Sequence, residues 1–351
     1  IGYNALTTQN SDAANYNVAV GSSAGAAITT GERNTFIGAL SGDALTDVDF
    51  NVGVGWGTLT SDILGSNSTA VGYRSLANSN FTTATDTFNV AVGYQSGVAI
   101  TTGIKNTLVG AEAGDALTNT NNNVAVGWQS LTTDTLGTKS TALGRAALQS
   151  QNFTTATNSD NVAVGYNAGN AVTTGISNTL IGTSAGDKLT DADYNVVVGS
   201  EALFTDTLGS RSTALGYFAL KTQNFTTATN SNNTAVGYAA GNAVTTGVSN
   251  TLIGALVGDA LTVGTRNVAI GTAALSADTL GSNSVAIGKS ALGAQNFTTA
   301  TDVYNTAVGA DAGLSVTTGI QNTLIGSQAG DALTDADYNV AVGKSALTAD
   351  T

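Results

Sequence analysis

The sequence is dominated by one short motif that returns along its whole length. The motif is Asn or Ser, Val or Thr, an apolar residue, an aliphatic residue and Gly, as in Asn17-Val18-Ala19-Val20-Gly21. The closing glycines stand at Gly21, Gly38, Gly55, Gly72 and Gly93, so their spacings run 17, 17, 17 and 21 before the series starts again. Four units therefore make one superrepeat, as from Gly21 to Gly93. A repeat of this kind constrains the fold strongly, because it is typical of solenoids and propellers.

Each motif is a short β-branched run between Asn and Gly, which predicts a strand with a turn at both ends. No window has the 3.6-residue periodicity of a long helix. A 17-residue spacing fits one coil of a parallel β-solenoid, whereas a propeller blade takes about 40 to 50 residues. We therefore expect an all-β, parallel β-solenoid of 20 coils, built from 17-residue and 21-residue coils in 72-residue superrepeats.

The repeat runs through residues 1–351 without a change of composition, so we expect one continuous solenoid region. With one strand spacing of about 4.8 Å per coil, the rod would be roughly 90 Å long. The chain lacks Met and begins and ends inside a unit, so we expect it to be truncated at both ends from a longer protein.

Side chains of a strand alternate between its two faces, so the second and fourth motif positions share one face and the third lies on the other. The fourth position is aliphatic in every complete unit, and we expect it to line the coil interior. This predicted intrachain core contains Val20, Ile37, Val92, Val164, Ile181, Ile253 and Ile325. Four phenylalanines near the four-residue insertion are also assigned to the core: Phe81, Phe153, Phe225 and Phe297.

The third position is expected to face away from the interior, yet it is apolar in every unit. An apolar stripe along a whole solenoid requires something to cover it. It could belong to a thicker core within one chain, or it could form a lengthwise interface with identical chains, which we favour. The expected interface residues are Phe36, Leu108, Leu180, Leu252, Leu324, Ala91 and Ala163.

The first position is Asn in 15 units and Ser in the four that precede a 21-residue spacing. Stacked asparagine side chains can hydrogen-bond from one coil to the next. We therefore expect an asparagine ladder along one corner of the solenoid.

The stretch Asn161-Val162-Ala163-Val164-Gly165-Tyr166-Asn167-Ala168-Gly169 resembles the head repeats of YadA-like trimeric autotransporter adhesins. It resembles still more the repeats of phage tail fibres, and the match covers essentially the whole chain. The 17-residue and 21-residue coils depart from the YadA-like pattern, in which a coil takes about 14 residues. The resemblance implies a left-handed parallel β-roll, assembled as a parallel homotrimer about the long axis.

The resemblance also implies a structural function. The chain would be the shaft of an extracellular or virion fibre that holds a host- or surface-binding tip at a distance. Its partners would be identical chains and neighbouring fibre segments. The alternative is a glycan- or matrix-binding head of a trimeric surface adhesin.

Composition argues against several other functions. The chain contains no His, Cys, Met or Pro, so it lacks imidazole bases, thiolate nucleophiles and soft metal ligands. A net charge of −13 leaves few cations to neutralise phosphates, so nucleic acid is not an expected partner. No apolar run reaches the roughly 20 residues of a membrane helix. We expect no enzymatic activity, no cofactor and no membrane insertion.

Two groups of residues are candidates for binding sites. Aspartates in the second coil of a superrepeat could hold calcium, because Ca²⁺ prefers oxygen ligands. They are Asp47, Asp49, Asp191, Asp193, Asp335 and Asp337. The equivalent turn is Val263-Gly264-Thr265 in another superrepeat, which favours a solvated turn over a required metal.

Aromatic residues form the second group, because they follow the closing glycine in some units. Examples are Trp56, Tyr73, Tyr94, Trp128, Tyr166, Tyr217 and Tyr238. At a surface corner these rings could stack on glycans, or they could cover the ends of the interior.

Overall fold

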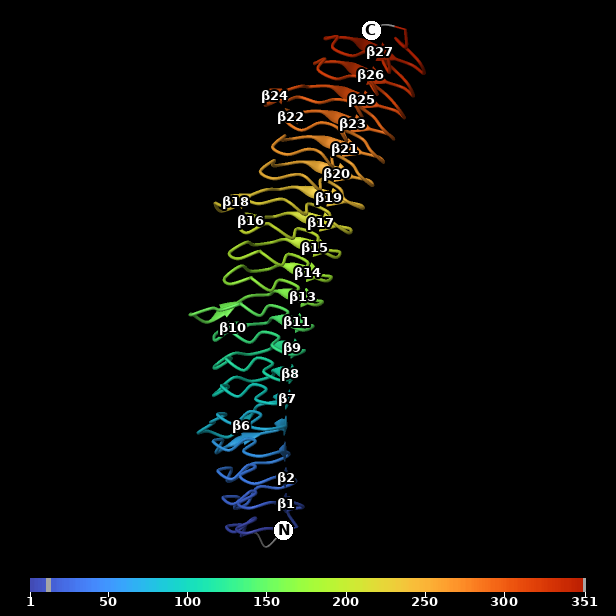
Figure 1. Cartoon of the computed structure of the whole chain (residues 1–351). Helices are drawn as coiled ribbons and strands as arrows, with labels where there is room; N and C mark the ends of the chain where they lie inside the picture. Colours follow the sequence, from blue (N-terminus) through green and yellow to red (C-terminus); the bar gives the residue numbers. More distant parts are fainter. Residues whose placement is uncertain (11–13, 350–351) are drawn as a thin grey trace. The chain divides into compact units, whose positions relative to one another are not determined.

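The computed structural model of the chain describes residues 1–10 and 14–349. Over these residues the chain is all-β, contains no helix and forms a parallel β-solenoid (Figure 1). The fold class predicted from the repeat is confirmed. The chain divides into two compact units, Ile1–Ile176 and Ser177–Thr351, which we describe separately.

In the first unit, nine coils each contribute a three-residue strand to one parallel ladder. These strands are β1 (Val18–Val20), β2 (Thr35–Ile37), β3 (Val52–Val54), β5 (Thr69–Val71), β7 (Val90–Val92), β8 (Thr107–Val109), β9 (Val124–Val126), β11 (Thr141–Leu143) and β13 (Val162–Val164). Each pairs with the strand of the next coil in register, so that Ala19 lies beside Phe36 and Ala70 beside Ala91. Equivalent motif positions therefore stack in columns.

The second unit has the same construction with ten strands. They are β14 (Thr179–Ile181), β15 (Val196–Val198), β17 (Thr213–Leu215), β19 (Thr234–Val236), β20 (Thr251–Ile253), β21 (Val268–Ile270), β23 (Val285–Ile287), β25 (Thr306–Val308), β26 (Thr323–Ile325) and β27 (Val340–Val342). All neighbouring pairs in this unit are parallel, and their motifs are again in register.

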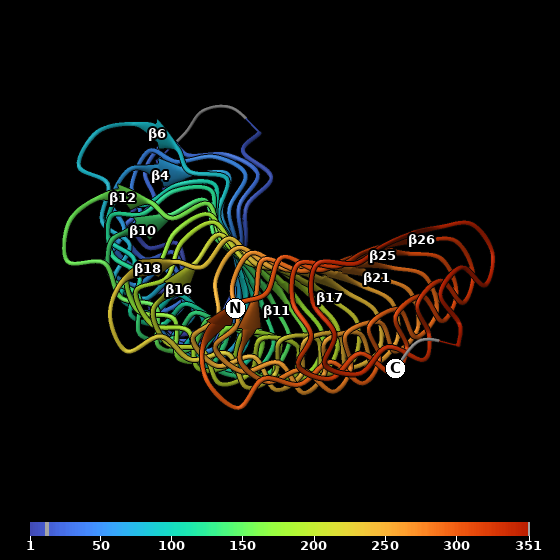
Figure 2. The same cartoon turned by 90° about the horizontal axis from the view of Figure 1, so that it is seen from above.

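The four-residue insertions form separate two-stranded ladders at the edge of the coil. In the first unit β4 (Gly65–Ser66) pairs with β6 (Thr85–Asp86), and β10 (Gly137–Thr138) pairs with β12 (Thr157–Asn158). In the second unit β16 (Gly209–Ser210) pairs with β18 (Thr229–Asn230), and β22 (Gly281–Ser282) pairs with β24 (Thr301–Asp302). Figure 2 shows the loops before β6 and β12 reaching outside the other coils of the first unit. The longer coils thus expand outward, and the main ladder keeps its register.

The structure reverses the two strand faces expected from the sequence. The residues assigned to an interface between chains are fully buried inside the coil: Phe36, Leu108, Leu180, Leu252, Leu324, Ala91 and Ala163. The strand residues assigned to the core lie instead on the outer face, half-buried or exposed: Val20, Ile37, Val92, Val164, Ile181, Ile253 and Ile325. The prediction that the third position lies opposite the second and fourth is confirmed. The prediction of which of these two faces is inside the coil is wrong. Phe81, Phe153, Phe225 and Phe297 are buried, in agreement with the core position expected for them.

The interior is thin, and this explains why the third position points inward. A Cβ on Gly42 would lie 2.5 Å from the Phe36 ring, and a Cβ on Gly114 would lie 2.8 Å from the Leu108 side chain. In the third and fourth coils of a superrepeat the inward strand residue is Gly, Ala or Val, and the position equivalent to Gly42 carries a buried leucine, such as Leu59. A large inward residue therefore fills the space that glycine leaves in its own coil or, as Leu108 does at Gly97, in the neighbouring coil. One chain thus covers its own apolar stripe.

The closing glycines form a column in which the backbones of successive coils nearly touch. Gly110 has φ +139°, and a Cβ at this position would lie 2.5 Å from the carbonyl oxygen of Gly127. Both the backbone conformation and the available space therefore require glycine there.

We expect Gly110→Ala to destabilise the solenoid by a few kcal/mol, because the methyl group meets a carbonyl oxygen and the backbone is strained. Gly343→Ala is the matched control, since Gly343 has φ +127° but no atom lies within 4 Å of the place that its Cβ would take. Urea unfolding monitored by circular dichroism measures both variants. Equal losses would show that backbone strain alone, and not the close approach of coils, selects glycine.

Candidate functional site

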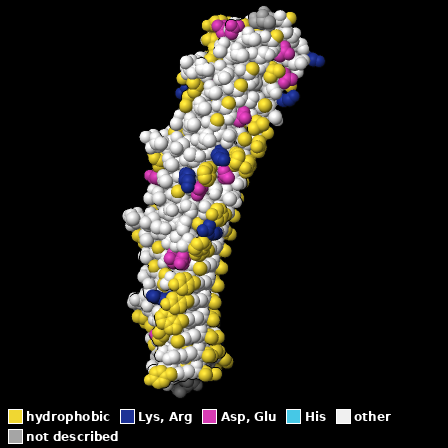
Figure 3. Space-filling model, in the orientation of Figure 1, with side chains coloured by type: hydrophobic (Ala, Val, Ile, Leu, Met, Phe, Trp, Pro, Cys, Tyr) yellow, Lys and Arg dark blue, Asp and Glu magenta, His cyan; other side chains and the backbone are white. Residues whose placement is uncertain are grey.

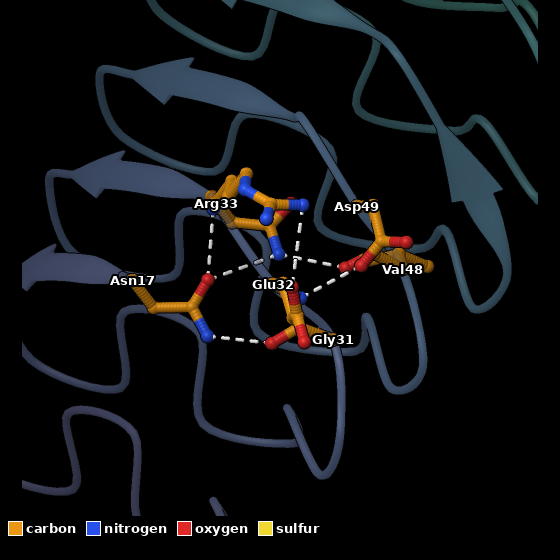
Figure 4. Close-up of polar contacts among 7 residues, drawn as sticks. Asn17, Gly31, Glu32, Arg33, Val48 and Asp49 are labelled. Carbon is orange, nitrogen blue, oxygen red and sulfur yellow. Dashed lines mark hydrogen bonds and ion pairs between the residues drawn. The ribbon is translucent and has the colours of Figure 1, made fainter. Parts of the chain in front are cut away.

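The asparagines at the first motif position form the expected ladder. Their side chains bond mostly to backbone groups of the next coil, as Figure 4 shows for Asn17. The Asn17 side-chain oxygen accepts a hydrogen bond from the Asn34 backbone N–H at 2.8 Å, and its amide donates to the Gly31 carbonyl at 2.7 Å. Asn34 repeats both bonds with the Asn51 N–H and the Val48 carbonyl. Each asparagine therefore joins two coils and closes a turn.

The four serines at the first position admit side chains from the insertion. Ser68 donates its backbone N–H to Asn51, as an asparagine would, but its hydroxyl bonds the Thr87 hydroxyl. Ser140 bonds Ser159 in the same way in the next superrepeat. The smaller residue thus makes room for one further side chain in the longer coil, a hydroxyl in three superrepeats and the buried Val303 in the fourth.

A buried aspartate anchors each insertion, and the sequence pattern did not single it out. Asp134 is fully buried, and its Oδ1 accepts the backbone N–H groups of Gly137 and Phe153 at 2.9 and 3.1 Å. Its Oδ2 accepts the Gln151 side-chain amide at 2.6 Å, while the Gln151 oxygen accepts the Asn161 amide. One signal was present in the sequence, because an aspartate precedes the Gln of Gln-Asn-Phe at the same spacing in three superrepeats: Asp134, Asp206 and Asp278.

The first superrepeat has a variant of this cluster. Asp62 accepts the N–H groups of Gly65 and Phe81, but Ser79 replaces the glutamine and donates its hydroxyl at 2.9 Å. Burial raises the pKa of Asp62, against the lowering effect of these hydrogen bonds. All of these partners belong to the insertion or its own turn, so the buried carboxylates position a loop.

Among the six aspartates considered for calcium, Asp47, Asp49 and Asp337 accept hydrogen bonds from a neighbouring coil through their carboxylates. Asp47 accepts the Thr30 hydroxyl at 2.6 Å, and Asp49 accepts the Glu32 N–H at 2.7 Å. Asp337 accepts the Ile320 N–H, and Asp335 accepts the Thr334 hydroxyl. In the second unit, the Asp193 N–H donates to Ser210, and Asp191 precedes it in the same turn. Within residues 1–10 and 14–349, no three His, Cys, Asp or Glu residues gather as a metal-ion site.

The aromatic residues after the closing glycines stack on one another at the surface. Trp56 stacks on Tyr73 with ring centroids 5.2 Å apart, and Tyr73 stacks on Tyr94 at 5.3 Å. In the second unit Tyr217 and Tyr238 are stacked at 5.9 Å. The rings are between 42% and 55% exposed, so they do not close the interior. Within a stack, as at Tyr73, both ring faces are occupied by neighbouring rings, so an open ring face remains only at the end of a stack.

A surface pocket in the second unit contains no charged side chain. It is lined by Ala273, Ser276, Ser290, Gly293, Ala294, Leu314 and Ser315. The lining offers hydroxyl groups but no carboxylate, amine or imidazole that would activate them.

No protein-family model matches the sequence, and no curated protein matches it either. Across the part of the chain that the structure describes, no helix has the length and apolar character needed to cross a membrane.

We expect Asp134→Asn to destabilise the chain by about 1–3 kcal/mol, because its new amide would face the Gln151 amide with donor against donor. The Gln151 side-chain amide cannot rotate by 180° without losing the hydrogen bond that its oxygen accepts from Asn161. Asp62→Asn is the matched control, since the Ser79 hydroxyl can reverse and accept the new N–H. Chemical unfolding at neutral pH compares the two variants. Similar losses at both sites would contradict the assigned hydrogen bonds.

We also expect Asp62 to make stability depend on pH. Because its folded pKa is raised, its contribution is fully present below the unfolded value of about 3.9 and is lost as pH rises through the folded pKa. The unfolding free energy of the native chain should therefore fall relative to Asp62→Asn as pH rises from about 3.5 through the raised pKa. Denaturant titrations across this range measure the difference, and a constant or rising value would count against a raised pKa.

Proposed function

We propose that this chain forms part of the shaft of an extracellular or virion fibre, as a parallel homotrimeric rod that holds a surface-binding tip at a distance. The supporting observation is the outer face of the main sheet, which a single chain leaves uncovered. Val18 and Val20 are 48% and 38% exposed in β1, and Val196 and Val198 are 41% and 37% exposed in β15. In the first unit, at the bottom of Figure 3, hydrophobic side chains gather lengthwise on the face in view.

The chemistry of this outer face suits an interface. In all 19 strands of the main sheet, the residues at the second and fourth motif positions are Val, Ile, Leu or Thr, and none is charged. Loss of charged residues is typical of the core of an interface. The face repeats with every coil, so a partner that matches it along its length needs the same repeat. An identical chain has this property, and three chains is the number implied by the resemblance to fibre repeats.

The internal bonding of each unit suits a mechanical role. Strand register, the asparagine ladder and the insertion anchors all join a coil to its immediate neighbours. Stability in such repeats adds up along the axis. The proposed activity is therefore to transmit position and force, and it needs no reactive group.

We expect the double variant Val196→Glu, Val198→Glu to remain folded but to assemble more weakly, because the assembly would bury its carboxylates. The control is Val197→Glu in the same strand, which should unfold the chain because Val197 is fully buried. Sedimentation equilibrium should give three times the chain mass for the native protein, and the double variant should dissociate at a concentration at least about tenfold higher.

Circular dichroism separates loss of assembly from loss of fold in both variants. A native chain that is folded and monomeric at micromolar concentration would rule out the trimeric shaft. A double variant that assembles as well as the native chain would place the interface elsewhere.

A further inference from the structure

The residues that follow the closing glycines in the first unit form one surface column. From β3 to β13 they are, in order, Trp56, Tyr73, Tyr94, Ala111, Trp128, Arg145 and Tyr166. Backbone bonds hold the column in register: the Glu112 N–H donates to the Tyr94 carbonyl at 2.8 Å, and the Gln129 N–H donates to the Ala111 carbonyl at 3.1 Å. Ala111 is the one member of this series with neither a ring nor a guanidinium.

The column already shows what fits between two rings that are two coils apart. The Arg145 guanidinium carbon lies 4.7 Å from the Trp128 ring centroid and 5.2 Å from the Tyr166 ring centroid. Its Nη1 also donates to the Tyr166 hydroxyl at 2.9 Å. A guanidinium sandwiched in this way gains cation–π attraction on both of its faces.

Tyr94 and Trp128 frame a second slot of the same kind, with Ala111 at its base. They too are two coils apart, which corresponds to about 10 Å. Tyr73 covers the far face of Tyr94, and Arg145 covers the far face of Trp128. Of the column itself, only the Ala111 methyl group stands between the faces turned toward it, and both rings are nearly half exposed.

A carboxylate stands next to this slot. Glu112 follows Ala111, and its Oε2 accepts the Gln129 side-chain amide at 2.9 Å. Gln129 is held in turn by the Gln149 amide at 3.1 Å. Glu112 is therefore held in place one residue after the base of the slot. Its negative charge adds to the attraction for a cation over a neutral planar group.

We propose that Tyr94, Trp128 and Glu112 form a binding slot for the guanidinium of an arginine side chain presented by a partner polypeptide. The neighbouring slot, between Trp128 and Tyr166, already contains the guanidinium group of Arg145. The net charge of −13 favours the approach of a basic partner. This lateral contact is independent of the trimeric shaft, because its residues lie in the column after the glycines and not on the strand face.

The test uses the full chain carrying Trp56→Phe, in which Trp128 is the only tryptophan and reports on the slot by fluorescence. The probes are acetyl-Gly-Arg-Gly-amide and the same peptide with citrulline or lysine in place of arginine. We expect a saturable change with the arginine peptide, and binding at least about fivefold weaker with the citrulline and lysine peptides. No saturable response to arginine, or equal affinity for citrulline, would overturn the proposal, and equal affinity for lysine would overturn the guanidinium assignment.

Two variants test the position of the slot. Ala111→Arg should fill it from within and weaken peptide binding by about tenfold or more. Ala310→Arg is the matched control, since it follows a closing glycine but has Lys289 and Ser327 as column neighbours, and it should leave binding unchanged. Arg145→Ala should open the slot between Trp128 and Tyr166, so that calorimetry counts two arginine peptides per chain. Retained binding in folded Ala111→Arg, or a single peptide bound to folded Arg145→Ala, would contradict the proposed geometry.

Discussion

The architecture depends on how closely the backbones of successive coils approach at the closing glycine. A side chain at Gly55 would place its Cβ 2.2 Å from the carbonyl oxygen of Gly72, and Gly110 is almost as crowded. The tight corner lets the chain bend immediately after a three-residue strand. One strand residue in three then points inward, and the interior is only as deep as that side chain and the turn opposite it. Volume must therefore balance within a coil, as between Phe36 and Gly42, or between adjacent coils, as between Leu108 and Gly97.

The interior is too thin to exclude polar groups. Buried polar side chains therefore form hydrogen bonds with groups of neighbouring coils. Asn34 and Asp134 are fully buried, and neighbouring coils supply most of the groups that bond their side chains. A buried polar group without a partner costs about 1–3 kcal/mol, so no coil is stable without its neighbours. The same interactions that hold the interior together thus make the repeat cooperative along its axis.

The sequence predicted the parallel solenoid, the coil lengths, the asparagine ladder and the buried phenylalanines, because each follows from spacing or from one residue type. It did not predict the phase of the strand, because alternation fixes which residues share a face but not which face is inside. A correlation was available in the last three coils of a superrepeat: glycine follows the turn where the strand residue is large, as at Phe36, and leucine follows it where the strand residue is smaller, as at Gly53 or Ala70. Asp134 was missed because its partners Gln151 and Phe153 belong to the next coil and meet it only in the folded chain.

The two outer surfaces differ in how much they repeat, and this bears on what each could recognise. The strand face carries the same uncharged residue types in every coil, so it distinguishes a matching repeat from other partners but not one coil from the next. The column after the glycines follows no such rule. One superrepeat earlier, the positions of Tyr94, Ala111 and Trp128 hold Ser22, Ala39 and Trp56, and one superrepeat later they hold Tyr166, Thr183 and Ser200. The pair of rings around a small residue therefore occurs once in this column of the first unit. Residues in this column do not pack in the interior, so the fold does not restrict their identity and each coil can differ. A repeat protein that presents a contact at one defined level along its axis must use positions of this kind.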